Sequence, residues 1–406
     1  MKNGRLKAPD PSRKDGFPMN YIVISPYYPA NFQPFSYKLR QHGVNVLGIG
    51  QEPYDQLNDE LKATLTEYFR VDNLEDLDQV TRAVAFFFHK YGPIDRIESH
   101  NEYWLELDAG LRQQFNIFGV KPQDLAKTKY KSVMKEYFRK AGVPVVDGRV
   151  VSQTSEIDAA VQDLGLPLIA KPDNGVGAAA TYKLMTPEDV AQFKATWGES
   201  TPYFLEQFVS YPTVTTFDGL IDAEGNIVFE TGLTYYYPPL ELVLERKDNA
   251  FYIEKELHPK LREYGHAIIK SFGMKERFFH IEFFRTPDDD FIAIEYNNRP
   301  AGGFCIDIYN YAHDIDLYDY WAKLVTGQEL PKQTAHGRYC LAVARRDEHT
   351  YVASHQDILE RYADQIKMTA RIPQAFADLL GDSLYVMTTP SRQVVDDMVR
   401  FVGQRV

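Results

Sequence analysis

Cysteine and long hydrophobic segments are both scarce in this sequence. Its 406 residues include only two cysteines, Cys305 and Cys340, so we expect no disulfide framework and a reducing compartment, the cytoplasm. The longest apolar run, residues 83–88, is far too short to cross a bilayer, so we expect no membrane partner. Residues 1–18 are basic and contain prolines without a hydrophobic centre, which excludes a secretion signal. We expect a disordered leader there, with Met19 as an alternative start.

An excess of positive charge is also missing. The formal net charge is −12, which argues against a nucleic-acid partner, although a local basic channel for nucleotide phosphates remains allowed. The sequence also has no P-loop, no zinc-ligand spacing, no Ser-His-Asp array and no GxGxxG after its first strand. The composition that is present, 44% hydrophobic and 25% charged, is typical of a soluble globular protein.

The chain is long enough for several domains, and its N-terminal part reads as α/β. Over residues 19–120, short apolar strands alternate with amphipathic helices, a pattern that predicts a parallel sheet flanked by helices. Such sheets bind ligands where the strand order reverses. We therefore expect a substrate to lie near Ser25, Pro26 and residues 100–102.

The stretch 277–303, RFFHIEFFRTPDDDFIAIEYNNRPAGG, predicts a β-hairpin with charges on one face. A four-residue loop, 287–290, would place Thr286 opposite Phe291. Counting back then pairs Glu282 with Glu295, and also His280 with Asn297. Two facing carboxylates repel each other, so we expect a cation between them, and oxygen ligands of this kind suit Mg²⁺.

The same face continues to Arg299, whose guanidinium is suited to a phosphate or a carboxylate. The alternative is an exposed hairpin whose charged face points into solvent. Residues 297–303 are poor strand material, which favours a binding site over that alternative. We expect His280 to be a hydrogen-bonded structural histidine and do not count it as catalytic.

HIEFF, a short turn and IEYNNRPAGG resemble the metal-binding end of the ATP-grasp ligases, whose pattern is a Glu followed by Glu-x-Asn-x-Arg. The resemblance implies Glu282, Glu295 and Asn297 as ligands of Mg²⁺, with Mn²⁺ as a substitute, and ATP held between two lobes. It implies a multidomain α/β and α+β fold: a pre-ATP-grasp domain with a parallel sheet at 19–120, then an ATP-grasp domain at 121–335. The latter divides into lobes 121–205 and 206–335, and residues 336–406 read as a small α+β cap.

The same resemblance assigns the nucleotide site. Lys131 stands at the first nucleotide-binding lysine of the family, with Tyr130 replacing an expected Asp and with Met134 and Lys135 matching. We interpret the other lysines of the basic helix 123–141 as a solvated face. Further residues are expected to bind ATP through a lysine and small-residue flap, 171–180, and through backbone groups of a hinge; these are Lys171, Gly175, Gly177, Glu206, Gln207 and Val209. Where the family has an acidic residue for the ribose, this chain has Thr213 or a neighbour.

The function implied by the resemblance is an ADP-forming ligase that activates a small carboxylate as an acyl phosphate and joins it to an amine. Lys171 and Arg299 would be its catalytic residues, because phosphoryl transfer needs positioning and charge neutralisation. Arg246, in the aromatic loop 235–249, is a candidate second anion site, or else pairs with Glu245 or Asp248. The alternatives are a phosphotransferase or carboxylase on the same scaffold, and a non-catalytic ATP-binding protein. We expect small-molecule partners, and a homodimer as a further option.

Overall fold

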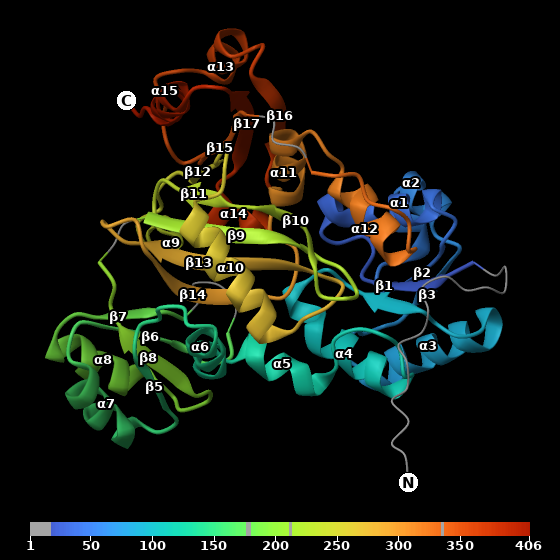
Figure 1. Ribbon diagram of the computed structural model, residues 1–406, viewed down its shortest axis with the longest axis horizontal. Helices are drawn as coiled ribbons and strands as arrows, with labels where there is room; N and C mark the ends of the chain where they lie inside the picture. The colour runs from blue at the N-terminus through green and yellow to red at the C-terminus, as the bar shows by residue number, and fades with distance from the viewer. Residues whose placement is uncertain (1–17, 176–179, 211–212, 334–336) are drawn as a thin grey trace.

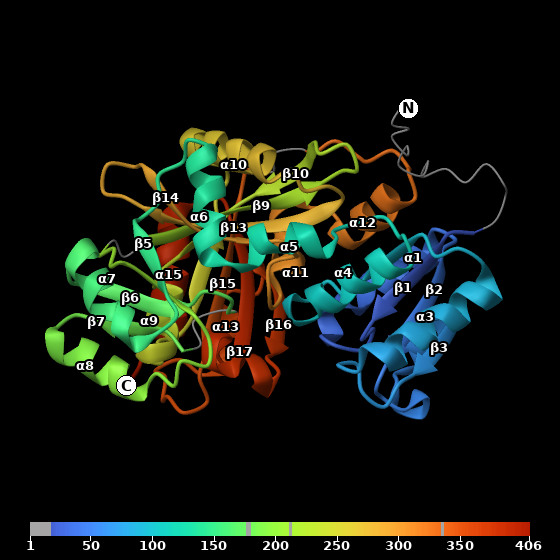
Figure 2. The ribbon, with the colours of Figure 1, turned by 90° about the horizontal axis from the view of Figure 1, so that it is seen from below.

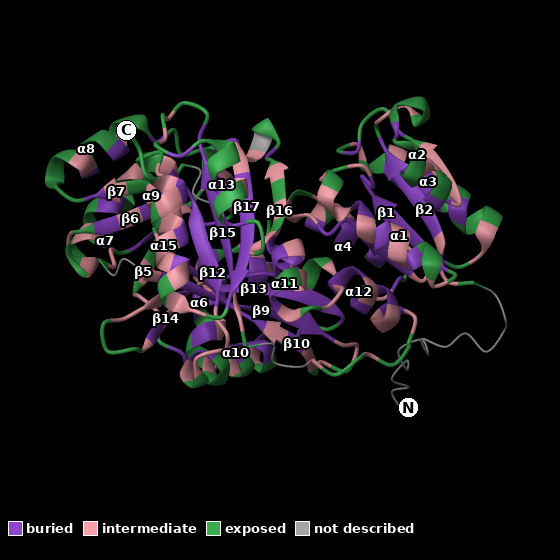
Figure 3. Ribbon diagram, turned by 90° about the horizontal axis from the view of Figure 1, so that it is seen from above, coloured by how far each residue is buried: buried purple, intermediate pink, exposed green. Residues whose placement is uncertain are grey.

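The computed structural model describes residues 18–175, 180–210, 213–333 and 337–406. Three β-sheets organise them, as Figure 1 shows: one sheet near the N-terminus, one in a small lobe, and one large sheet that runs into the C-terminal region. Figure 3 shows that the buried residues concentrate in the strands of the large sheet and of the N-terminal sheet. The mixed α/β class expected from the sequence is confirmed.

The N-terminal sheet is parallel, with strand order β3-β2-β1-β4. Its strands are β1 (Asn20–Ile24), β2 (Asn45–Gly50), β3 (Glu67–Arg70) and β4 (Arg96–Glu98), connected through α1 (Gln33–Gln41), α2 (Asp59–Thr64) and α3 (Leu77–Tyr91). The chain builds outward from β1 to β3 and then crosses to the other side of β1, so the strand order reverses between β1 and β4. The carboxyl ends of those two strands are where a doubly wound sheet binds ligands.

The small lobe is an antiparallel sheet of order β5-β8-β6-β7, with α7 (Ile157–Leu164) and α8 (Pro187–Thr196) beside it (Figure 2). Its strands are β5 (Gly148–Val151), β6 (Leu168–Pro172), β7 (Tyr182–Leu184) and β8 (Tyr203–Gln207). The predicted lobe boundary between residues 205 and 206 therefore falls inside β8, whose whole length belongs to this sheet.

The large sheet has nine strands, in the order β14-β13-β9-β11-β12-β15-β17-β16, with β10 paired to β9. They are β9 (Thr213–Ile221), β10 (Ile227–Thr231), β11 (Leu233–Tyr235), β12 (Ala250–Ile253), β13 (Arg277–Arg285), β14 (Phe291–Asn297), β15 (Tyr339–Arg345), β16 (Ile366–Arg371) and β17 (Ser383–Thr389). The last three strands come from the predicted cap. The cap therefore extends the central sheet through β12 and β15 and does not form a separate layer.

Helices cover this sheet and join it to the N-terminal part. They are α4 (Leu105–Gln114), α5 (Pro122–Lys129), α6 (Lys131–Lys140), α9 (Pro239–Leu244), α10 (Pro259–Phe272), α11 (Cys305–His313), α12 (Leu317–Val325), α13 (His355–Arg361), α14 (Ala377–Leu380) and α15 (Arg392–Gly403). Gly265 lets α10 approach β9 closely, since a Cβ there would lie 2.2 Å from the Phe217 ring. The ring of Phe35 in α1 packs edge-on against the ring of Tyr318 in α12, with 4.7 Å between the ring centroids, and this contact joins the N-terminal part to α12.

The basic segment predicted as one helix, 123–141, is two helices, and this prediction was wrong in that detail. The break lies at Tyr130, whose backbone is extended (φ −91°, ψ 117°) and forms a β-bridge with Asn174. The amide of Lys131 donates to the Asp173 carbonyl at 2.9 Å in place of a carbonyl one turn back. The helix end expected at Gly142 is confirmed, because Gly142 adopts φ +73° directly after Ala141.

Candidate functional site

The hairpin β13–β14 places its charged residues as the sequence predicted, but by a different route. Phe291 pairs with Arg285 and not with Thr286. By itself, this difference would shift every pair of the hairpin by one residue from the predicted register. Ile294 then bulges out of the ladder, and the bulge restores the pairs Glu282 with Glu295 and His280 with Asn297. The expected loop register was therefore wrong, whereas the pairing of the two carboxylates is confirmed.

His280 neutralises one of those carboxylates. Its Nε2 lies 3.2 Å from Glu282 Oε1, and its Nδ1 lies 2.6 Å from Oδ1 of Asp218 on the adjacent strand β9. Burial by itself would lower the pKa of His280, but Asp218 and Glu282 raise it to about 10. The ring is therefore protonated at neutral pH, which makes it a charge partner of Glu282 and unsuitable as a base.

Glu295 has a cationic neighbour on α6. The Lys131 Nζ atom, at the start of α6, lies 3.5 Å from Glu295 Oε1 and donates to the Gly175 carbonyl at 2.7 Å. Burial raises the pKa of Glu282, but His280, with smaller contributions from Arg299 and Lys171, lowers it by more. The cations expected to bind phosphate and the carboxylates expected to bind metal thus converge from separate segments.

Lys171 belongs to a buried ion cluster that the sequence did not reveal. One carboxylate oxygen of Glu206 contacts Lys171 Nζ, and the other lies 3.1 Å from Lys135 Nζ. Burial would raise the pKa of Glu206, but the two lysines lower it to about 2. Burial would also lower the pKa of Lys171, but Glu206, and more weakly Glu295 and Glu282, raise it.

Lys135 therefore does not belong to a solvated face, and that interpretation was wrong for this residue. It is only 1% exposed, and its Nζ also lies 3.3 Å from the Ala293 carbonyl of β14. The signal that could have identified it was already visible: the Met134-Lys135 pair matches the resembled pattern.

Asp173 caps α6 from a distant segment. Its carboxylate accepts from the Ser132 amide and from the Ser132 hydroxyl, each at 2.8 Å. The resembled pattern places an Asp directly before the first lysine, and here that position is Tyr130. Here the carboxylate of Asp173, 41 residues beyond Ser132, caps this helix end.

Of the remaining hinge and flap residues, the structure describes Gln207, Val209 and Gly175. Gln207 closes β8 with an exposed side chain that donates to the Leu164 carbonyl at 3.2 Å, and Val209 follows two residues later. Gly175 is tied to α6 through Lys131. Gly177 falls within 176–179, outside the described residues.

Arg299 is held on both sides of its guanidinium. Its Nε donates to Glu102 Oε2 at 2.7 Å, its Nη2 to Asn297 Oδ1 at 3.3 Å and its Nη1 to the Pro300 carbonyl at 2.9 Å. Glu102 follows β4 of the N-terminal sheet. The contact therefore joins the end of the N-terminal sheet at which a ligand was expected to Arg299, the arginine expected to bind the carboxylate.

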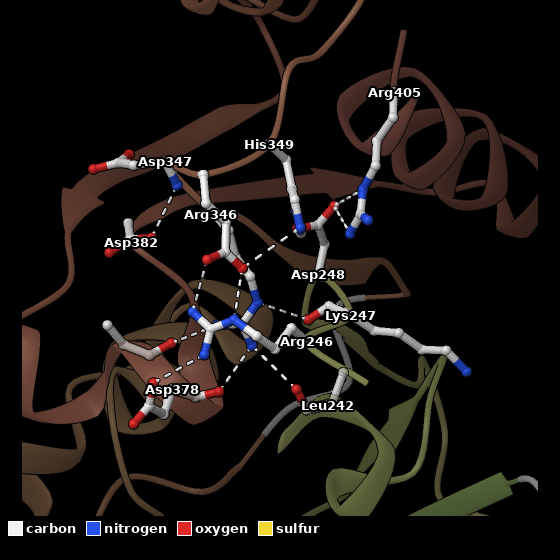
Figure 4. Close-up of polar contacts among 12 residues, drawn as sticks. Leu242, Arg246, Lys247, Asp248, Arg346, Asp347, His349, Asp378, Asp382 and Arg405 are labelled. Atoms are coloured by element: carbon white, nitrogen blue, oxygen red, sulfur yellow. Dashed lines mark hydrogen bonds and ion pairs between the residues drawn. The ribbon is translucent and has the colours of Figure 1, made fainter. Parts of the chain in front are cut away.

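Arg246 lies apart from these groups, where the segment 235–249 meets the C-terminal strands (Figure 4). The sequence predicted a loop over this segment, which was wrong in part, because residues 239–244 form α9. Its guanidinium forms a two-point contact with Glu348, at 2.6 and 3.1 Å, and reaches Asp378 Oδ1 at 3.3 Å. Arg246 therefore pairs with two carboxylates of the C-terminal segment, and not with Glu245 or Asp248, the partners considered from the sequence. The neighbouring Arg346 is buried and donates to four backbone carbonyls, which fastens α9 to α14.

The donor set fits the expected metal. Glu282, Glu295 and the Asn297 amide supply oxygen ligands on neighbouring register positions, the chemistry that Mg²⁺ and Mn²⁺ favour. In the described part of the chain, no group of three or more His, Cys, Asp or Glu side chains is arranged to hold a metal, so a metal here would share its shell with phosphate or water. None of the described helices combines the length and the apolar character needed to span a bilayer.

No family model matches the sequence. A curated protein from Sinorhizobium fredii, the uncharacterized protein y4rH, is 25% identical over 320 residues, which cover 77% of this chain and 61% of that protein. The L-arginine-specific L-amino acid ligase of Bacillus subtilis is 26% identical over 242 residues, 57% of this chain and 58% of that ligase. The chain thus spans about six tenths of the length of these two curated relatives.

Solved structures resemble the whole chain. An L-amino acid ligase from Bacillus licheniformis has a TM-score of 0.72 at 13% identity, covering 94% of this chain and 96% of that one. An N5-carboxyaminoimidazole ribonucleotide synthetase in complex with ADP has a TM-score of 0.69 at 12% identity, covering 95% and 96%. The sheets, their order and these likenesses agree with the sequence motifs, and the chain has the ATP-grasp fold.

Proposed function

We propose that this chain is an ATP-dependent carboxylate–amine ligase that activates a small carboxylate as an acyl phosphate, joins it to an amine, and releases ADP and phosphate. The observation that carries the proposal is the convergence at β13–β14. Two facing glutamates, a lysine from α6 and Arg299 come together on one face of the central sheet. A protein that only bound a nucleotide would have no need of paired metal carboxylates next to a guanidinium.

Each group has a role that follows from its charge and position. Lys131 and Lys171 bind phosphate oxygens, and Glu206 with Lys135 holds Lys171 in place. Glu282, Glu295 and Asn297 would hold Mg²⁺, which when bound neutralises phosphate charge and orients the phosphates. Arg299 binds the carboxylate beside the transferred phosphoryl group, so that the protein supplies positioning and charge neutralisation without a nucleophile of its own.

The curated ligase from Bacillus subtilis and the solved ligase from Bacillus licheniformis both carry the name L-amino acid ligase, which supports an amino acid as the carboxylate substrate. Carboxylases also share the fold, and one biotin carboxylase is 30% identical over 41% of this chain. The test must therefore separate amine ligation from carboxylation.

The test is ADP and phosphate release by the purified chain with ATP, Mg²⁺ and pooled amino acids and other small carboxylic acids, with product masses measured in parallel. We expect stoichiometric ADP and a product whose mass equals two substrates minus water. Stimulation by bicarbonate alone would identify a carboxylase instead. Absence of stimulation by any small carboxylate would overturn the proposal. A homodimer and a cytoplasmic location stay predictions.

A further inference from the structure

A cavity of about 140 Å³ opens beside the first turn of α10. Three apolar side chains line it, those of Leu257, Leu261 and Phe291, together with the hydroxyl groups of Thr215 and Thr234 and a few charged groups. A water molecule takes up about 30 Å³ in the liquid, so the cavity has room for a small organic molecule. An apolar lining with a few polar groups is typical of small-molecule sites.

The cavity lies on the opposite face of the central sheet from the metal site. Thr215 pairs with Phe283, which packs in the same core cluster as Leu261 of α10. The next residue, Thr216, pairs with Glu282. Since successive side chains of a strand point to opposite faces, Thr215 and Glu282 point away from each other. The sheet therefore separates an occupant of this cavity from the groups assigned to phosphate and metal.

Glu254, directly after β12, is the charged group of this cavity that lacks a charge partner. It is half-buried, and no cationic side chain in the described part of the chain forms an ion pair with it. Burial raises the pKa of Glu254 above its ordinary value, and the Tyr252 hydroxyl and more distant positive charges lower it by less. A carboxylate removed from water without a cation is unfavourable.

The two arginines that act on Glu254 from a distance are engaged by other carboxylates. Arg285 donates through its Nε to Asp289 at 2.7 Å. Arg392 contacts Asp396 one turn further along α15. A positive charge directly on Glu254 is therefore left to a ligand.

The hydroxyl groups of the cavity also offer acceptors rather than donors. Thr215 donates its hydroxyl hydrogen to the Leu233 carbonyl at 2.9 Å. The Thr234 hydroxyl, 3.1 Å from that of Thr215, must then be the donor between the two, which leaves only lone pairs on Thr234 Oγ1 for a ligand. Glu256, exposed at the rim, adds a second carboxylate. A ligand that matches this lining carries hydrogen-bond donors and a positive charge.

We propose that this cavity binds a small organic ammonium ion, with the ammonium on Glu254 and the alkyl part against Leu257, Leu261 and Phe291. The site is separate from the one at which the ligase would act and goes beyond the function proposed above. An ammonium of this kind belongs either to a simple amine or to an α-amino acid. The carboxylate of an amino acid would have Arg285 to contact, since no described residue accepts from the Nη atoms of Arg285.

The experiment compares butylamine with its uncharged isostere butanol, by ligand-observed NMR in a buffer free of amines. We expect wild type to bind butylamine at least about tenfold more tightly than butanol. In Glu254→Gln that advantage should disappear, while butanol binds as before. The matched control is Glu263→Gln, which removes an exposed carboxylate from α10. Butylamine binding should persist in Arg299→Ala, because the cavity lies on the other face of the sheet.

Norvaline identifies the source of the ammonium, because it is butylamine with a carboxylate on the carbon that bears the nitrogen. The comparison is made in the Arg299→Ala background, so that the carboxylate site proposed for the ligase does not contribute. If the source is an amino acid, norvaline binds more tightly than butylamine and loses this advantage in Arg285→Met. If the source is a simple amine, butylamine binds more tightly than norvaline.

Unchanged butylamine affinity in Glu254→Gln would overturn the inference, and so would an equal loss for butylamine and butanol. Without ligand, Glu254→Gln should be at least as stable in urea as wild type, because it removes an anion without a cation. A less stable variant would show that Glu254 already has a favourable partner in the protein, which contradicts the inference. None of these measurements involves turnover, so their failure leaves the ligase function intact, and absence of ADP release would leave this site intact.

Discussion

Glu282 and Glu295 face each other across β13 and β14, each with a different cationic neighbour: His280 at 3.2 Å from Glu282 and Lys131 at 3.5 Å from Glu295. Without a metal, these two cations offset the repulsion that facing carboxylates would otherwise produce. The arrangement is thus stable as described and still offers two oxygen ligands to an incoming metal.

Replacing one of these carboxylates should abolish turnover without unfolding the protein. Glu295→Gln removes one metal ligand and keeps the side-chain volume, so we expect weaker binding of Mg·ATP and loss of ADP formation. Circular dichroism should stay unchanged. Asp288→Asn, which removes an exposed carboxylate from the turn of the same hairpin, is the control. Full activity in Glu295→Gln would remove the metal assignment.

The buried cluster of Lys135, Glu206 and Lys171 should behave as a unit. Lys135→Met leaves Glu206 with one partner, and breaking a buried pair typically costs about 3–5 kcal/mol. The double variant Lys135→Met/Glu206→Gln should lose less stability in urea unfolding than the sum of the two single variants, because both remove the same ion pair. Additive losses in this double-mutant cycle would show that Lys135 and Glu206 are not coupled.

Asp173 should affect both stability and nucleotide binding, since it caps the helix that begins with Lys131. Asp173→Ala removes two hydrogen bonds to Ser132 and should cost about 1–2 kcal/mol, with a raised KM for ATP. Ser132→Ala removes only the hydroxyl contact and should have a smaller effect on both. A raised KM in Ser132→Ala alone would point to a direct role for that hydroxyl.

The buried side chain of His100 should make the folded protein less stable in acid. Burial lowers its pKa to about 4, against the opposing influence of Glu98. In the unfolded chain the pKa of a histidine is ~6.5, so between this pKa and the folded one the folded state binds fewer protons. The stability of the protein therefore falls as the pH falls through this range. Burial also raises the pKa of Asp108 to about 6, and this change acts in the opposite direction over an overlapping range.

The contribution of His100 must therefore be measured as a difference. His100→Asn keeps a residue that tolerates a positive φ and removes the titrating ring. From pH 7 to pH 4, the unfolding free energy of wild type should fall relative to that of the variant by up to about 3 kcal/mol. A difference that is constant with pH would show that the ring is not held neutral by burial.

The two arginines of Figure 4 give opposite expectations. Arg246 is exposed, so Arg246→Ala should leave ADP formation and unfolding close to wild type. Arg346→Met removes a buried guanidinium bound to four carbonyls and should destabilise the protein by at least about 2 kcal/mol. Loss of activity in Arg246→Ala, with stability retained, would restore Arg246 as an anion site.

The sequence by itself determined the features that depend on short-range periodicity. Alternation along a strand places Glu282, Glu295 and Arg299 where a hairpin would bring them together. Even the loop error did not matter to the site, because the bulge at Ile294 restored the pairing. The glycine after α6 ended that helix where its backbone freedom predicts.

Tertiary structure alone decided which charged and hydrogen-bonding groups pair with one another. Tyr130 interrupts a segment with a continuous helical pattern, and the Asp173 carbonyl, distant in sequence, accepts from the Lys131 amide. Lys135 looked like a solvated lysine because its partner, Glu206, is distant in sequence, and Glu102 reaches Arg299 across a separation of 197 residues. Periodicity is set by local backbone geometry, whereas an ion pair depends on how whole sheets pack, and that packing minimises the number of buried charges left without a partner.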